Sequence, residues 1–91
     1  GGKLVSWTPG AEPKTLLEKA PGGKELGPND IAVSANGFLY FTTLKDPEKG
    51  RVTAVNLKTG AAAVCLDGEE HPELANPNGV AASPDGKAVY V

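Results

Sequence analysis

Short apolar segments, each ended by a turn rich in glycine, proline or asparagine, follow one another along the whole chain. This pattern is typical of β-strands joined by tight turns. A short helix is an alternative for residues 14–19, but that segment is brief and Pro21 follows it closely. No segment predicts a long helix, so we expect an all-β protein. The strands are predicted at residues 3–7, 14–19, 30–35, 38–43, 51–57, 61–66, 79–83 and 87–91.

One stretch of fifteen residues occurs twice. Residues 28–42 are PNDIAVSANGFLYFT and residues 77–91 are PNGVAASPDGKAVYV; aligned without gaps, they share five positions and start 49 residues apart. Each copy predicts a Pro-Asn turn and two strands joined by a hairpin turn. Asn36 and Gly37 both tolerate positive φ, so they predict a tight hairpin turn in the first copy. The repeat distance is in the range of a β-propeller blade.

The even spacing of the strands predicts four-stranded antiparallel blades. Residues 28–76 would form a complete blade, residues 1–27 the last two strands of a blade, and residues 77–91 the first two. The two partial segments together have 42 residues, which is also a blade length. Residues 2–4 (GKL) align with residues 50–52 (GRV) at the same point of the blade cycle. The chain therefore corresponds to two blades.

Two blades cannot close a propeller ring, which usually has four to eight. We expect identical chains to close it, with strand 87–91 of one chain pairing with strand 3–7 of a neighbour. Three chains would form a six-bladed homotrimer. The sequence does not exclude rings of two or four chains. Two other interpretations are also possible: the chain is a piece of a longer protein, or it is a small independent β domain.

The composition of the chain limits which classes of partner it is expected to bind. The net charge of −2 predicts no surface for nucleic acid. The apolar runs are too short to span a membrane, and the first residues show no signal-peptide pattern. We expect a soluble protein of unassigned compartment that binds neither nucleic acid nor membranes. The single cysteine, Cys65, excludes an internal disulfide, and we expect it to be a packed thiol.

The stretches GPNDIAVSANGFLYFT and NPNGVAASPDGKAVYV resemble paired motifs of the senescence-marker-protein/gluconolactonase family, the regucalcin-like lactonases. The family pattern is P-N-D-[ILV] with a later [YW]-F-T, followed one blade on by P-N-G-[ILV]-A-x-S-P-D-G-x-x-[LV]-Y-V. The resemblance covers nearly the whole chain but only part of a family member. It implies a six-bladed propeller with a divalent metal, often calcium, at the tunnel mouth, where the metal polarises a lactone carbonyl.

By this resemblance, Asn78 matches the metal-ligating Asn of P-N-G, and Asn29 matches the Asn of P-N-D beside the substrate or the metal's water. An amide oxygen suits a hard cation, so Ca²⁺ is the expected ion. Alternatively, both side chains bond nearby backbone within their turns. Asp30 is a weaker metal candidate, for which a turn role is favoured. We expect no catalytic residue and no other cofactor site.

The sequence departs from the family in its acidic residues. It lacks the Glu of an early E-G-P-type motif and the Asp of a later P-D-G motif, because Asp85 lies at a hairpin turn. Thr43 stands where members often carry Asp. We therefore expect a self-assembling propeller module, engineered or excised, that binds a cation at its axis. The alternative is one part of a metal-dependent hydrolase acting on a small lactone.

Three further features more simply have structural roles. The acidic loop 67–73 lacks a defined metal-ligand spacing, and we expect it to be solvated. Its His71 has no Ser/His/Asp arrangement around it and is expected to be exposed. We expect Trp7 to pack within a blade rather than to form an exposed ligand platform, and the charged loop 44–50 to be solvated.

Overall fold

The computed structural model describes residues 2–23, 26–43, 50–72, 74 and 77–91. Each predicted strand is present there, most of them shorter than expected, and no α-helix occurs within these ranges. The all-β expectation is confirmed. The charged loop 44–50, which was expected to be solvated, lies outside the described residues except for its last residue. The elements are β1 (Leu4–Ser6), β2 (Lys14–Leu17), the 3₁₀ turn η1 (Pro21–Gly23), β3 (Ile31–Val33), β4 (Phe38–Thr43), β5 (Arg51–Asn56), β6 (Ala62–Asp67), β7 (Ala81–Ala82) and β8 (Val89–Tyr90).

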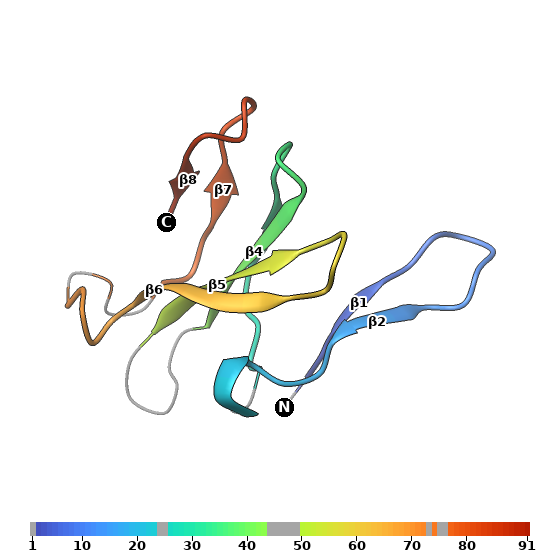
Figure 1. Cartoon of the computed structure of the whole chain (residues 1–91), viewed down its shortest axis with the longest axis horizontal. Coiled ribbons are helices and arrows are strands. Elements are labelled where there is room, and N and C mark those ends of the chain that lie inside the picture. Colours follow the sequence, from blue (N-terminus) through green and yellow to red (C-terminus); the bar gives the residue numbers. More distant parts are fainter. Residues whose placement is uncertain (1, 24–25, 44–49, 73, 75–76) are drawn as a thin grey trace.

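The strands form a central sheet flanked by two hairpins. The central sheet has the order β3-β4-β5-β6, and β1-β2 and β7-β8 are separate two-stranded sheets; all pairs are antiparallel. The two hairpins lie on opposite sides of the central sheet (Figure 1). This arrangement is compatible with propeller blades. The division of the chain into blades and the closure of a ring stay predictions.

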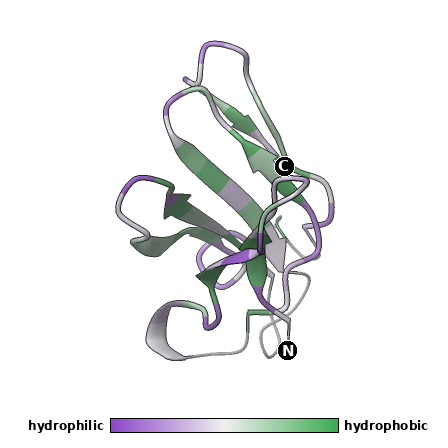
Figure 2. Ribbon diagram, turned by 90° about the vertical axis from the view of Figure 1, so that its right-hand side faces the viewer, coloured by the Kyte–Doolittle hydropathy of each residue, from purple (hydrophilic) through white to green (hydrophobic). Residues whose placement is uncertain are grey.

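The β1–β2 hairpin packs on one face of the central sheet. Because side chains alternate along a strand, Leu39 and Phe41 of β4 point to this face together with Val55 of β5. They are 5%, 0% and 1% exposed. Apolar residues are concentrated in the strands and polar ones in the turns (Figure 2). We call the packing of the β1–β2 hairpin on this face of the central sheet the closed contact. Its buried cluster is Leu4, Ala20, Leu26, Leu39, Phe41 and Val55.

The β1–β2 and β5–β6 pairs share an irregularity. The register shifts after Leu4 in β1 and after Val52 in β5, and the unpaired extra residue is Leu16 in β2 and Cys65 in β6. Alignment of residues 2–4 with 50–52 places the two shifts at the same point. A bulge changes the twist and aim of a strand, so its position is a specific structural mark. The β1–β2 hairpin therefore has the geometry of the last two strands of the central sheet.

The hairpins of the repeated stretch differ in turn length. In the first copy the Ser34 N–H donates to the Phe38 carbonyl at 2.8 Å; in the second, the Ser83 N–H donates to the Ala88 carbonyl at 2.9 Å. The second turn thus contains one residue more. A gap-free alignment of the two copies fails beyond the turn for this reason.

The longer turn makes two tyrosines equivalent. Ala32 of β3 pairs with Tyr40, and the corresponding Ala81 of β7 pairs with Tyr90. Without gaps, Tyr90 would instead match Phe41. The structural correspondence therefore aligns β8 with β4 one residue away from the register that the sequence alone suggested.

The hairpin turn predicted at Asn36 and Gly37 is present, and of these two residues only the glycine adopts positive φ. Among the described residues only glycines have positive φ, including Gly37 at 88° and Gly86 at 74°. Asn36 instead stabilises the turn through its side chain, whose Oδ1 accepts from the Phe38 N–H at 3.2 Å. Glycine at the following position supplies the left-handed residue that a three-residue hairpin loop requires.

Candidate functional site

Asn29 and Asn78 lie 49 positions apart and meet where β3 and β7 begin. The Nδ2 of Asn29 donates to the Oδ1 of Asn78 at 2.7 Å, and both residues are exposed. The structure thus brings together the two residues singled out by the family resemblance. Their bond connects two hairpins, rather than each side chain only to its own turn. A metal-binding role for the pair stays a prediction.

Thr42 and Asp30 hold this pair in place. The Thr42 hydroxyl donates to the Asn78 carbonyl at 2.8 Å and accepts from the Asp30 N–H at 3.2 Å. The Asp30 Oδ2 accepts from the Val80 N–H at 3.0 Å. Asp30 therefore connects the central sheet to the start of the β7–β8 hairpin, a long-range role that the sequence did not suggest. Sequence reasoning missed Thr42, although it is the last residue of the Y-F-T motif.

Among the described residues, the donor set of one chain is too small for a calcium site. Calcium takes six to eight oxygen ligands, whereas the described side chains at this end of the sheet include two neutral amides and a carboxylate already bonded to backbone. Thr43, where the family often carries Asp, donates its hydroxyl to the Leu26 carbonyl at 3.0 Å. Across the described ranges, no group of three or more His, Cys, Asp or Glu residues could hold a metal ion.

Asp85 belongs to the opposite end of the hairpin. Its Oδ1 accepts from the Ser83 hydroxyl at 2.7 Å and from the Lys87 N–H at 3.0 Å, and these hydrogen bonds lower the pKa of Asp85. The same turn touches the first one, where the Asn36 Nδ2 donates to the Gly86 carbonyl at 3.3 Å. Asp85 is therefore a turn residue, as expected from its motif.

The acidic loop after β6 is organised as a turn. The Oδ1 of Asp67 accepts from the N–H groups of Glu69 and Glu70 at 3.0 and 2.9 Å, and the two glutamates are exposed. The last acidic residue of the loop lies outside the described residues. His71 is half-buried, so the expectation of an exposed histidine is wrong. It turns toward the apolar side chains of β6 and β8.

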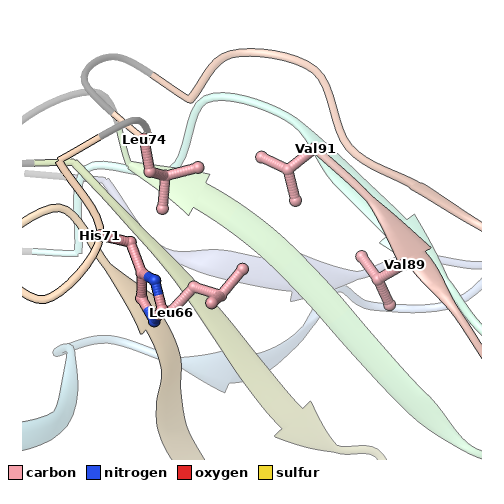
Figure 3. A pocket seen from close by; sticks show the side chains of 5 residues that line it. All are labelled: Leu66, His71, Leu74, Val89 and Val91. Carbon is pink, nitrogen blue, oxygen red and sulfur yellow. The ribbon is translucent and has the colours of Figure 1, made fainter.

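These side chains surround a hollow of about 240 Å³ between β6 and the β7–β8 hairpin. In the close view, Leu66 and His71 lie on one side of it and Val89 and Val91 on the other (Figure 3). Leu74 completes the lining. We call the packing of the β7–β8 hairpin on this face of the sheet the open contact, because its apolar centre is hollow.

Two residues that were expected to pack are exposed. Cys65 is one of them; its Sγ still donates to the Val52 carbonyl at 3.4 Å, and partial desolvation raises the pKa of the thiol, which disfavours the nucleophilic thiolate. Trp7 was expected to pack within a blade, but its side chain is 62% exposed. It follows β1, whose only partner strand in the described part of the chain is β2.

None of the described helices is long and apolar enough to cross a membrane.

A family model described as SMP-30/Gluconolactonase/LRE-like region matches residues 3–91. The comparisons with curated proteins and with solved structures gave no match.

Proposed function

Because the chain belongs to the SMP-30/gluconolactonase/LRE-like family, we propose that it is a self-assembling building block of a six-bladed β-propeller. Three copies would close the ring, each supplying one complete blade and two half-blades. β8 of one copy pairs with β1 of the next in this assembly. The resulting blade has strands β7 and β8 from one copy and β1 and β2 from its neighbour.

The shared bulge carries this proposal. It gives the β1–β2 hairpin the geometry of β5–β6, while the alanine–tyrosine pairs give the β7–β8 hairpin the geometry of β3–β4. Joining β8 to β1 therefore reproduces the order of the central sheet. Among the described strands, β1 pairs only with β2 and β8 only with β7. Each strand thus has a free edge for such pairing.

The apolar surface along these edges supports the same assembly. Val5 in β1 is 50% exposed, Tyr90 in β8 is 65% exposed, and the adjacent Val91 is 49% exposed. Free strand edges with apolar side chains tend to pair with another chain unless they are protected. Pairing β8 with β1 of a second copy removes both edges together.

The assembly also concerns the cation expected at the mouth. Family members typically depend on a metal. In a ring of three copies, three Asn29–Asn78 pairs surround the axis, so the amide oxygens approach the number that calcium takes. We expect millimolar calcium to raise the melting temperature of the assembly and Asn78→Ala to abolish the rise. An equal rise in the variant, or none in the wild type, contradicts an axial calcium site.

Lactone hydrolysis is the second candidate function, and the family match favours it. The described residues place no free carboxylate beside Asn29 and Asn78 to act as general base, since Asp30 is bonded to Val80. We therefore expect the purified chain not to hydrolyse a simple lactone with or without calcium. Calcium-dependent hydrolysis that Asn78→Ala abolishes would instead establish the enzyme.

Removal of residues 87–91 tests the assembly. Without β8 the shared blade lacks a strand, so sedimentation velocity should show three chains for the wild type and one for the truncated protein. The control is Leu57→Ser, which changes an exposed side chain (40%) after β5, away from both free edges. Circular dichroism verifies that each variant keeps its strands. A truncated protein that retains the wild-type mass overturns the proposed assembly.

A further inference from the structure

We propose that the hollow in the open contact receives the Trp7 side chain of a neighbouring copy of the chain. The inference rests on the assembly proposed above and adds the residue that fills its apolar interface. It follows from comparing the hollow with the closed contact, position by position.

The lining of the hollow corresponds to the buried cluster of the closed contact. The pair Val52–Leu66 precedes the bulge in β5–β6 as Leu4–Leu17 does in β1–β2, so Leu66 is the counterpart of Leu17. Leu17 packs against the buried cluster. On the β6 side of the hollow, Leu66 thus corresponds to Leu17, a residue that packs in the closed contact.

The other side of the hollow corresponds to β4. Val89 pairs with Ala82 as Leu39 pairs with the equivalent Val33, so Val89 takes the place of Leu39. Two residues further on, on the same face of the strand, Val91 takes the place of Phe41. The β7–β8 side of the hollow is therefore lined by the counterparts of Leu39 and Phe41, which are buried in the closed contact.

The missing member is the counterpart of Val55. Val55 lies three residues after Val52, and Trp7 lies three residues after Leu4, at the same distance beyond the shared bulge. Val55 is 1% exposed whereas Trp7 is 62% exposed. Val55 is the one member of the buried apolar cluster that β5 supplies, and the β7–β8 hairpin has no strand to supply its counterpart, whose position is that of the exposed Trp7.

The sizes of the side chains agree with this match. In the closed contact a small Val55 packs with Leu39 and Phe41. In the open contact the corresponding positions, in β8 and directly after it, carry the smaller Val89 and Val91. A tryptophan in place of valine compensates for the lost volume, as close packing of a core requires.

The occupant is a second copy because β1 and β8 lie on opposite sides of the central sheet within one chain (Figure 1). The pairs Leu39–Val55, Tyr40–Ala54 and Phe41–Thr53 give the register between copies. Carried over to the shared blade, they place Val89 and Tyr90 of β8 and the following Val91 opposite Trp7, Ser6 and Val5 of the neighbour.

Fluorescence provides a direct test, because Trp7 is the only tryptophan. The assembled fraction is measured by light scattering along a dilution series, and acrylamide quenching is measured in the same samples. We expect the emission to shift to shorter wavelength and quenching to fall severalfold as the assembly forms. Equal quenching in monomer and assembly overturns the inference while leaving the assembly intact.

A size exchange provides the second test. Trp7→Val alone leaves the hollow unfilled and should weaken association at least about tenfold, as loss of a buried interface tryptophan does. Adding Val89→Leu and Val91→Phe copies the closed contact and should restore assembly. Leu57→Ala, in the exposed turn after β5, is the matched control and should assemble as the wild type does.

The outcomes separate the two proposals. A wild-type chain that stays folded and monomeric at all concentrations overturns the assembly and this inference together. An assembly that Trp7→Val does not weaken overturns the inference alone. Binding of a small apolar dye to the hollow of an assembly whose Trp7 stays exposed assigns the hollow to a ligand, and also contradicts the inference.

Discussion

The two faces of the central sheet carry one hairpin each, and the two contacts differ in how they are held. In the closed contact, the β1–β2 hairpin buries a continuous apolar cluster that includes Leu4, Phe41 and Val55. In the open contact, the β7–β8 hairpin leaves a hollow between Leu66 and Val89. The apolar side chains are therefore closely packed on one face of the central sheet, whereas on the other face they surround a hollow.

Polar bonds compensate at the open contact. At one end of the hairpin, the Asn29–Asn78 and Asp30–Val80 bonds connect it to the central sheet. At the other end, the Asn36 amide donates to the turn that follows β7. Each bond contributes only about 0.5–1.5 kcal/mol, but together they orient the hairpin although the apolar centre of the contact is hollow. At the open contact, hydrogen bonds therefore set the position of the hairpin, whereas at the closed contact buried apolar side chains stabilise the packing.

Loss of a large side chain from each contact should have unequal effects. Phe41→Ala empties the centre of the closed contact and should lower the free energy of unfolding by about 3–5 kcal/mol. Val91→Ala, at the corresponding position of the open contact, removes a side chain that is already 49% exposed and should have little effect on a dissociated chain. Urea denaturation at a concentration that favours the dissociated chain measures both. Equal losses would show that the two contacts are not different in kind.

A methyl group at Gly86 tests the fit between the two hairpin turns. A Cβ there would lie 3.1 Å from the Asn36 nitrogen and 3.2 Å from the Ser34 Oγ, and the φ is +74°. Gly10 has a similar φ of +90° but open space around it, so Gly10→Ala is the matched control. The conformational cost of about 1–2 kcal/mol applies to both variants. Gly86→Ala should lower the melting temperature further, and an equal decrease would contradict contact between the turns.

Removal of a buried hydroxyl should strengthen the closed side. Thr53 is fully buried on this face of β5, and its Oγ1 makes no hydrogen bond. A buried polar group without a partner is destabilising, so Thr53→Val should raise the free energy of unfolding by about 1 kcal/mol. Urea denaturation checks this value. A destabilised variant would indicate that the hydroxyl has a partner after all.

The smallest effect concerns pH and the turn of the open hairpin. The hydrogen bonds from Ser83 and Lys87 lower the pKa of Asp85 in the folded state. The stability that they contribute is therefore complete above the unfolded pKa of about 3.9 and is lost as the pH falls through the lower folded value. Thermal melts of wild type and Asp85→Asn between pH 7 and 2 should converge at the acidic end. Curves that stay parallel would contradict this role of Asp85.

The sequence was sufficient to predict the strands and their turns, because each apolar segment is short and glycine or asparagine follows it. It also brought Asn29 and Asn78 to attention through their shared motif. The contact between them could not be predicted, since it depends on how two hairpins pack across 49 positions. The extra residue in the second turn was also missed, because matching S-A-N-G with S-P-D-G conceals that the two ladders close at different residues.

The exposure of Trp7 was the least predictable feature. An isolated tryptophan after an apolar strand is usually packed, and the sequence alone cannot show that the side chain is exposed. The alignment of residues 2–4 with 50–52 already matches Trp7 with Val55, and the register of the two bulged hairpins supports this match; that Val55 is a core residue came only from the structure.

The mass of the full chain in solution, by light scattering at micromolar concentration, tests the central claim most directly. The account predicts a particle of three chains of 9.3 kDa each, with the free edges of β1 and β8 joined. A folded monomer over the whole concentration range would contradict it, because the open contact would then be the finished state of the molecule.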